Sequence, residues 1–162
     1  MVKGIVTDPS YKLHTVASEA DIQSDECKRA MEDLWDTYRE NNSPKGLSAP
    51  QISKPLRVII CRLGKVPVMM INPTIEKESK IRLNSNEGCE SVKSRYIVKR
   101  PLWLRVSYTT ENGQRVQRFC WWGHSRVVSH ECDHLLGKLI SDYPSKRWVN
   151  VVENMRKKRQ SL

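Results

Sequence analysis

The stretch Val127-Val128-Ser129-His130-Glu131-Cys132-Asp133-His134-Leu135 decides how the rest of the chain is interpreted. Its two histidines stand four residues apart, so on a helix they lie one above the other and both imidazoles can reach one metal ion. Glu131 is rotated away from them, where its carboxylate can activate a metal-bound water for attack on a carbonyl. We expect a helix over 124–136, ended by Gly137. The pattern predicts a metal-dependent hydrolase.

Two histidines leave a metal site incomplete, and the sequence offers three places to look for a third ligand. In the long HExxHxxGxxH signature the last position is Ile140, which cannot bind a metal. Glu153 follows the helix at a spacing that thermolysin-like peptidases use, so that alternative stays open. The third candidate is Cys89, because the preceding glycine permits a tight loop and a thiolate is a natural ligand of iron or zinc.

The hydrophobic pattern elsewhere predicts one helix before a region of strands. Apolar residues recur at helical spacing over 24–40, with Ser24 as the N-cap. Strands are expected over 56–63, 66–71, 102–109 and 114–120, the last two joined by an Asn-Gly turn. We therefore expect a single α+β domain over residues 1–162, with mixed or antiparallel short-stranded sheets around a central metal-binding helix.

Composition excludes several classes of protein. The 162 residues include 28 Lys and Arg against 18 Asp and Glu, a net charge of +10 that favours an anionic partner. The longest apolar runs, 58–61 and 68–71, are far shorter than the roughly 20 residues that span a bilayer, so we expect no membrane partner. Because the five cysteines form an odd number and no secretory signal is evident, we expect a reducing compartment, the cytoplasm or an organelle matrix.

Three separated motifs resemble those of the peptide deformylase family. They are Gly46-Leu47-Ser48-Ala49-Pro50-Gln51, similar to GxGLAAxQ, Glu87-Gly88-Cys89-Glu90-Ser91, similar to EGCxS, and 130–134 followed by Gly137, similar to HExDHxxG. Their order and separation also fit, over about residues 13–143. The resemblance implies a deformylase-like fold and removal of the N-formyl group from the starting methionine of nascent polypeptides. It implies ferrous iron as the physiological metal, with zinc, nickel or cobalt as substitutes.

The resemblance also implies roles for individual residues. The metal ligands it implies are Cys89, His130 and His134, and the general base and acid is Glu131. The side-chain amide of Gln51 and the backbone N–H of Glu90 are expected to stabilise the oxyanion. The substrate contacts are expected from Lys45, Gly46, Gly88 and Arg95. Glu87, Arg100 and Asp133 are candidates to pair with one another and orient a ligand histidine.

The sequence departs from the family motifs without losing a ligand or the base. Ser48 stands where the family has its first alanine, and Glu90 where bacterial members have leucine. One family glycine is also lost in Pro44-Lys45-Gly46. Since the expected oxyanion donor at residue 90 is a backbone N–H, the glutamate does not remove it. These changes concern rate and side-chain preference, not the type of reaction.

A basic tail closes the chain, with a helix expected at about 145–160. It contains Lys146, Arg147, Arg156, Lys157, Lys158 and Arg159 against Glu153 alone. A solvated helix end explains it, and so does docking on ribosomal RNA near the peptide exit, as the C-terminal helix of bacterial deformylases is thought to do. No aromatic-rich platform for single strands accompanies the tail. A non-catalytic RNA-binding module is the second alternative, and the intact Glu131 argues against it.

Overall fold

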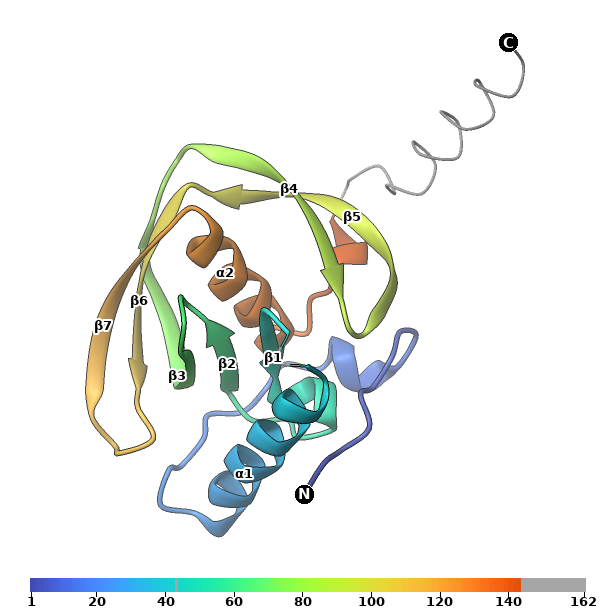
Figure 1. Cartoon of the computed structure of the whole chain (residues 1–162), viewed down its shortest axis with the longest axis vertical. Helices are drawn as coiled ribbons and strands as arrows, with labels where there is room; N and C mark the ends of the chain where they lie inside the picture. Colours follow the sequence, from blue (N-terminus) through green and yellow to red (C-terminus); the bar gives the residue numbers. More distant parts are fainter. Residues whose placement is uncertain (43, 144–162) are drawn as a thin grey trace.

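Two helices and two antiparallel sheets make up the part of the chain that the computed structural model describes, residues 1–42 and 44–143 (Figure 1). This arrangement confirms the α+β class, and the helix expected at about 145–160 lies outside the described residues. The elements are η1 (Tyr11–His14), α1 (Asp25–Glu40), β1 (Gly46–Ser48), η2 (Ala49–Ile52), β2 (Val58–Arg62), β3 (Pro67–Glu78), β4 (Arg82–Cys89), β5 (Val92–Pro101), β6 (Trp103–Thr109), β7 (Arg115–Trp121), α2 (Gly123–Leu135) and η3 (Ile140–Asp142).

Both helices begin and end close to where the sequence signals place them. The Ser24 hydroxyl accepts a hydrogen bond from the Cys27 backbone N–H at 3.1 Å and so caps α1. After α2, Gly137 adopts a left-handed φ of 68°. A Cβ on Gly137 would lie 2.6 Å from the backbone of His14, so only glycine fits where the chain leaves the helix.

The larger sheet has the strand order β1-β2-β3-β6-β7, with every neighbouring pair antiparallel. Strand β3 continues to Glu78, so the prediction that it ends at Ile71 is wrong. The apolar run that predicted this strand ends at Ile71, and two register shifts in the pairing with β6 leave no regular alternation of buried and exposed residues beyond it. The other predicted strands of this sheet are confirmed to within about two residues at each end.

Strand β2 lies at the centre of the core, between the two helices. Val58 and Ile60 point into the apolar cluster that α1 covers, whereas Ile59 and Cys61 point into the cluster that α2 covers. All four side chains are fully buried. One side of α2, which includes Val128 and Leu135, packs on the sheet, and its histidines are left for the other side.

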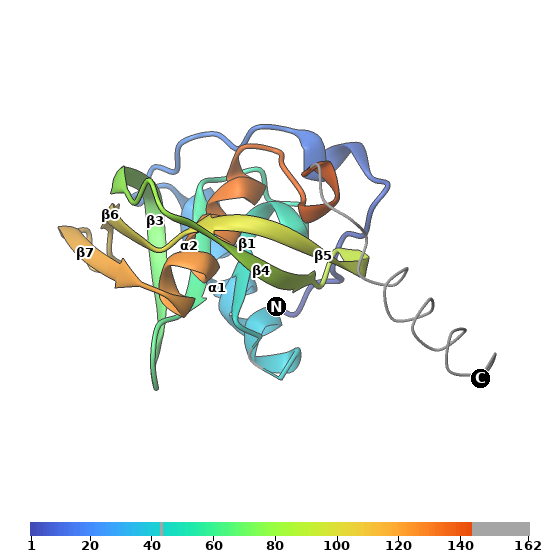
Figure 2. The same cartoon turned by 90° about the horizontal axis from the view of Figure 1, so that it is seen from above.

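The second sheet is the long hairpin of β4 and β5, which the hydrophobic pattern did not single out. It runs beside α2 in both views (Figures 1 and 2), and β5 packs directly against that helix. Cys89 ends β4 and pairs with Val92 across a tight connection. The hairpin therefore brings a residue more than 40 positions earlier in the chain to the histidine face of α2. Within the described residues, neither helix is long and apolar enough to cross a membrane.

Candidate active site

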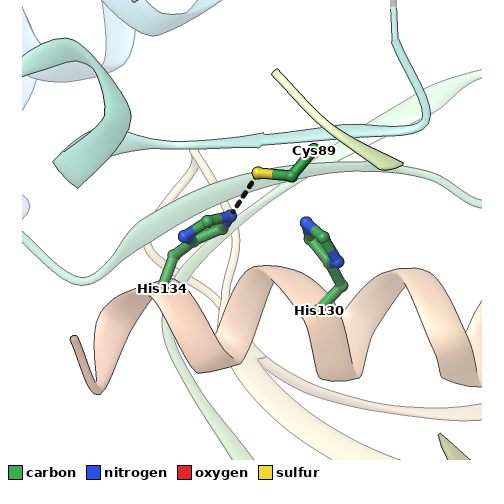
Figure 3. Close-up of side chains that lie close together, drawn as sticks. All are labelled: Cys89, His130 and His134. Carbon is green, nitrogen blue, oxygen red and sulfur yellow. Dashed lines mark hydrogen bonds between the residues drawn. The ribbon is translucent and has the colours of Figure 1, made fainter. Parts of the chain in front are cut away.

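Cys89 at the end of β4 lies close to His130 and His134 of α2, and the three side chains form a cluster (Figure 3). One ligand atom from each of them lies within 4.8 Å of those from the other two. The Sγ of Cys89 is 3.3 Å from Nε2 of His134, and the two imidazole rings have centroids 5.0 Å apart. The structure thus brings together the three residues expected as ligands. Glu153, the ligand of the alternative hypothesis, lies outside the described residues.

The chemistry of these three side chains fits a divalent transition metal. One thiolate and two imidazoles make up a donor set that suits iron or zinc. His134 is buried, and burial holds its pKa well below the usual range, so its ring stays neutral with a lone pair available. Cys89 is only partly buried, which leaves the cluster open on one side. An open position is characteristic of catalytic rather than structural metal sites.

A carboxylate orients the ring of His130. The Oε2 of Glu87 lies 3.0 Å from Nδ1 of His130. The opposite ring nitrogen is therefore left to bind a metal together with Cys89 and His134. Burial opposes ionisation of Glu87, but hydrogen bonds from His130 and Arg100 prevail and lower its pKa to about 2. Without a metal, burial lowers the pKa of His130, but hydrogen bonds with Cys89 and Glu87 outweigh burial and raise this pKa to about 10, so a metal that binds there must displace this proton. Glu87 therefore stays ionised, and its negative charge makes His130 a stronger electron-pair donor to a metal.

Arg100 holds this carboxylate in place from β5. Its guanidinium donates to both oxygens of Glu87, at 3.0 and 2.8 Å, and to Asp133 at 2.5 Å. The pairing expected among these three residues is confirmed. Sequence reasoning missed Tyr143, whose hydroxyl donates to Asp133 at 2.6 Å and accepts from Arg100 at 3.2 Å. These hydrogen bonds tie Asp133 of α2 to Glu87 and Arg100 of the hairpin.

Glu131 occupies a different environment, although it follows His130 directly. Its side chain is 4% exposed, and Oε2 has no hydrogen-bond partner among the described residues. Burial raises the pKa of Glu131 to about 7. Its other oxygen packs against the backbone of Gly46, where an added Cβ would come within 2.3 Å of Oε1. A carboxylate with a raised pKa and a free oxygen is suited to accept and return a proton near neutral pH.

The amide of Gln51 is fixed by hydrogen bonds to both of its ends. Its Oε1 accepts from the backbone N–H and the hydroxyl of Ser48, at 3.0 and 2.9 Å. Its Nε2 donates to Ser91 at 3.0 Å and lies 3.6 Å from Sγ of Cys89. Ser48 therefore has a structural reason to replace the family's alanine, and neither serine was expected to hold Gln51. The amide N–H₂ group points toward the cluster.

These groups open into a cleft of about 590 Å³. The cleft runs between β1 and the β4–β5 hairpin, and it is lined by every substrate-contact candidate, namely Lys45, Gly46, Gly88 and Arg95, and by Glu90. Arg95 is held over Gly88 by two hydrogen bonds to Asn86, at 3.1 and 2.9 Å. Glu90 and Lys45 are exposed at the rim. The structure therefore places all of the expected site residues around this cavity except His134, which is buried beside Cys89.

Comparison with known proteins decides the family. The family model described as polypeptide deformylase matches residues 2–149. The chain belongs to the polypeptide deformylase family. A peptide deformylase of Pelagibacter ubique is 32% identical over 151 residues, which cover 90% of this chain and 87% of the relative. Peptide deformylase 2 of Ralstonia nicotianae is 35% identical over 158 residues, with 90% and 87% covered.

Solved deformylase structures have the same fold as this chain. A peptide deformylase from Ehrlichia chaffeensis superimposes with a TM-score of 0.83 at 25% identity, covering 99% of this chain and 98% of that one. A class I type b peptide deformylase from Acinetobacter baumannii with Met-Ala-Ser bound gives 0.82 at 28% identity, covering 88% and 99%. The deformylase fold that the three motifs indicated is confirmed.

Proposed function

We propose that this chain removes the N-formyl group from the starting methionine of nascent polypeptides, with Glu131 as the base and acid. Its relatives are named peptide deformylase, and one relative holds a Met-Ala-Ser peptide. The observation that carries the assignment is the free, buried oxygen of Glu131 beside the Cys89, His130 and His134 cluster. A formyl carbonyl is small enough to reach this group at the bottom of the cleft.

Cys89, His130 and His134 would hold the metal, and we propose ferrous iron as the physiological ion. When bound, such an ion polarises the formyl carbonyl and lowers the pKa of water toward neutrality. Glu131 takes the proton from the attacking water and returns it to the departing amine nitrogen. The C–N bond breaks, and the products are formate and a free amino terminus.

Two hydrogen-bond donors are proposed to stabilise the negative charge that develops on the carbonyl oxygen. The Gln51 amide is held rigidly 3.6 Å from Sγ of Cys89, so it requires no reorganisation during the reaction. The backbone N–H of Glu90 follows Cys89 directly at the turn of the hairpin. Because the side chain of Glu90 is exposed, it does not occupy the space that the oxyanion needs.

The free edge of β1 is proposed to bind the peptide backbone. The carbonyl of Lys45 accepts from Arg62 of β2, so the backbone groups of the next residue, Gly46, point to the open side of the strand. An extended peptide can add there as a further strand. Lys45 and Arg95 stand at the rim of the cleft, where they would attract acidic residues of the peptide.

The two glycines of the cleft allow a matched test of this geometry. A Cβ on Gly46 would lie 2.3 Å from Oε1 of Glu131, so Gly46→Ala must displace the base. Because a misplacement of about 1 Å can cost about 100-fold in rate, we expect kcat for formate release to fall by about that factor. In Gly88→Ala the Cβ meets only the flexible end of Arg95, so its kcat should change by less than about threefold. Equal losses in both variants, at equal metal content, would contradict the assignment of Glu131.

The function itself is tested by formate release from formyl-Met-Ala-Ser, with acetyl-Met-Ala-Ser as the matched control. The protein is loaded with Fe²⁺ without air, because a thiolate beside ferrous iron is open to oxidation. We expect formate from the formyl peptide and no product from the acetyl peptide. Cleavage of an internal peptide bond in both substrates would instead support the thermolysin-like alternative.

The place of action follows from the substrate. None of the five cysteines, all of which lie within the described residues, forms a disulfide, and we propose the cytoplasm or an organelle matrix, reducing compartments where polypeptides are made. We also propose that the basic residues after Tyr143 dock on ribosomal RNA. That segment lies outside the described residues, so its charge alone supports the proposal.

A further inference from the structure

Three aromatic rings form a continuous array on the outer face of β6 and β7. Trp103 of β6 pairs directly with Trp121 of β7, and the ring of Phe119 contacts both tryptophan rings. The ring centroids of Trp103 and Phe119 are 5.6 Å apart, and those of Phe119 and Trp121 are 6.4 Å apart with the ring planes 25° from parallel. Phe119 is 56% exposed and Trp121 is 53% exposed. Trp103 is half-buried. Exposed aromatic rings grouped in this way indicate an interaction surface.

The array is independent of the core and of the active site. The alternate residues of the same strands, Leu104, Val106 and Cys120, point inward and are buried against the α2 side of the core. None of the three rings lines the catalytic cleft. Strand β7 is also the last strand of its sheet, at the edge of the molecule in Figures 1 and 2. The rings therefore have no role in folding or catalysis that explains their exposure.

Two cations flank the rings on the same face. Arg105 of β6 pairs directly with Phe119 on one side and with Lys77 of β3 on the other. Neither cation forms an ion pair with any residue in the described ranges. Of the nearby carboxylates, Glu78 is paired with Arg82, whereas Glu76 accepts a hydrogen bond from the neutral hydroxyl of Ser107 and keeps its negative charge. The face thus combines stacked aromatic rings with two cations, Lys77 and Arg105, whose positive charge exceeds the negative charge of Glu76.

We propose that this aromatic face, made up of Trp103, Phe119, Trp121, Lys77 and Arg105, binds single-stranded RNA. Unpaired bases stack on exposed rings regardless of sequence, and adjacent cations take the phosphates. A duplex does not fit, because its bases are already stacked on one another. The exposed amide of Gln117, next to Phe119 along the outer face, can donate to and accept from a 2′-hydroxyl, which favours RNA over DNA.

This surface could not be recognised from the sequence. Trp103 and Trp121 stand 18 residues apart, and the residues between the rings are polar or point inward. Only the β6–β7 hairpin register brings them together, so the sequence pattern predicted no aromatic platform. The inference uses none of the residues of the proposed deformylase site, and the two can fail separately.

The test measures the affinity of the full-length chain for a fluorescent oligoadenylate by fluorescence anisotropy. The oligonucleotide has about ten nucleotides, a length that one such face can hold. Phe119→Ala and Trp121→Ala should each weaken binding by about tenfold, because stacking on one ring is lost. Both should leave the dependence of affinity on salt unchanged. Arg105→Gln should instead lower the slope of log K against log salt by about 0.7, the effect of one phosphate contact on a single strand.

Tyr11→Ala is the matched control, because Tyr11 is 79% exposed on η1, on the side of the molecule away from β7 (Figures 1 and 2). It should bind RNA as the wild type does, and all four variants should release formate at the wild-type rate.

Equal affinity of the wild type and Phe119→Ala would overturn the proposal, because the basic tail would then account for binding. Equal affinity for duplex RNA or for the DNA of the same sequence would also overturn it. The proposal would also be overturned if the protein dimerises and Phe119→Ala abolishes the dimer without changing the affinity for RNA. If the wild type binds RNA but releases no formate, only the deformylase assignment is contradicted.

Discussion

Glu131→Gln is expected to lower kcat for formate release by about 1,000-fold, within the range that a positioned general base contributes. Glutamine keeps the shape of the side chain but cannot accept the proton of the attacking water. The variant should keep its metal, because Glu131 is not one of the three clustered ligand residues. Formate release under saturating formyl-Met-Ala-Ser, with metal measured on the same sample, checks both expectations.

The stability of this variant supplies its internal control. Glu131 is 4% exposed and has one oxygen without a partner among the described residues, so its ionised form carries a desolvation cost in the folded state. A neutral amide reduces that cost. We therefore expect the metal-free Glu131→Gln protein to unfold at the same temperature as the wild type or higher, at pH 7.5. A less stable variant with reduced metal would mean that Glu131 acts structurally.

Cys89→Ala is expected to abolish both metal binding and formate release. Removal of a group that only supports a ligand costs 10–100-fold in affinity or activity, so loss of a ligand itself should cost more than about 100-fold. The variant leaves two histidines, which do not make up a complete transition-metal site. Metal content after dialysis and formate release after reloading measure the loss.

Glu153→Gln is the contrasting variant for this prediction. If Glu153 were the third ligand, as in thermolysin-like peptidases, this change would strip the metal and Cys89→Ala would have a mild effect. The position of Cys89, with Sγ 3.3 Å from Nε2 of His134, predicts the reverse order. Full metal in Cys89→Ala would contradict the site described above.

Local features of the fold and site could be predicted from the sequence because their signals lie within one or two turns. The spacing of His130 and His134 fixes their common face on α2, and Ser24 caps α1 through a residue three positions later. The three motifs added the identity of Cys89 as their partner. Each of these predictions depends on contacts along one helix or on a motif that can be recognised in the amino-acid sequence itself.

The rest of the site depends on contacts between distant segments. Arg100 reaches Glu87 and Asp133, which are 13 and 33 residues away, and Tyr143 joins them from beyond α2. Ser48 was recognised as a departure from the family motif, but its purpose follows only from the orientation of the Gln51 amide. The β4–β5 hairpin has few apolar residues, so its strands gave no clear alternation. The pairing of Arg100 with Glu87 and Asp133 was expected, but only the folded chain shows the contacts of Tyr143, the role of Ser48 and the hairpin itself.

The most direct test of the metal centre is the near-ultraviolet absorption of the protein loaded with Co²⁺. A thiolate bound to cobalt gives a sulfur-to-metal charge-transfer band, whereas a site of two histidines and a carboxylate has no sulfur ligand to produce one. The wild type and Glu153→Gln should both show this band, and Cys89→Ala should lack it. A cobalt-loaded, active wild type without the band would contradict ligation by Cys89.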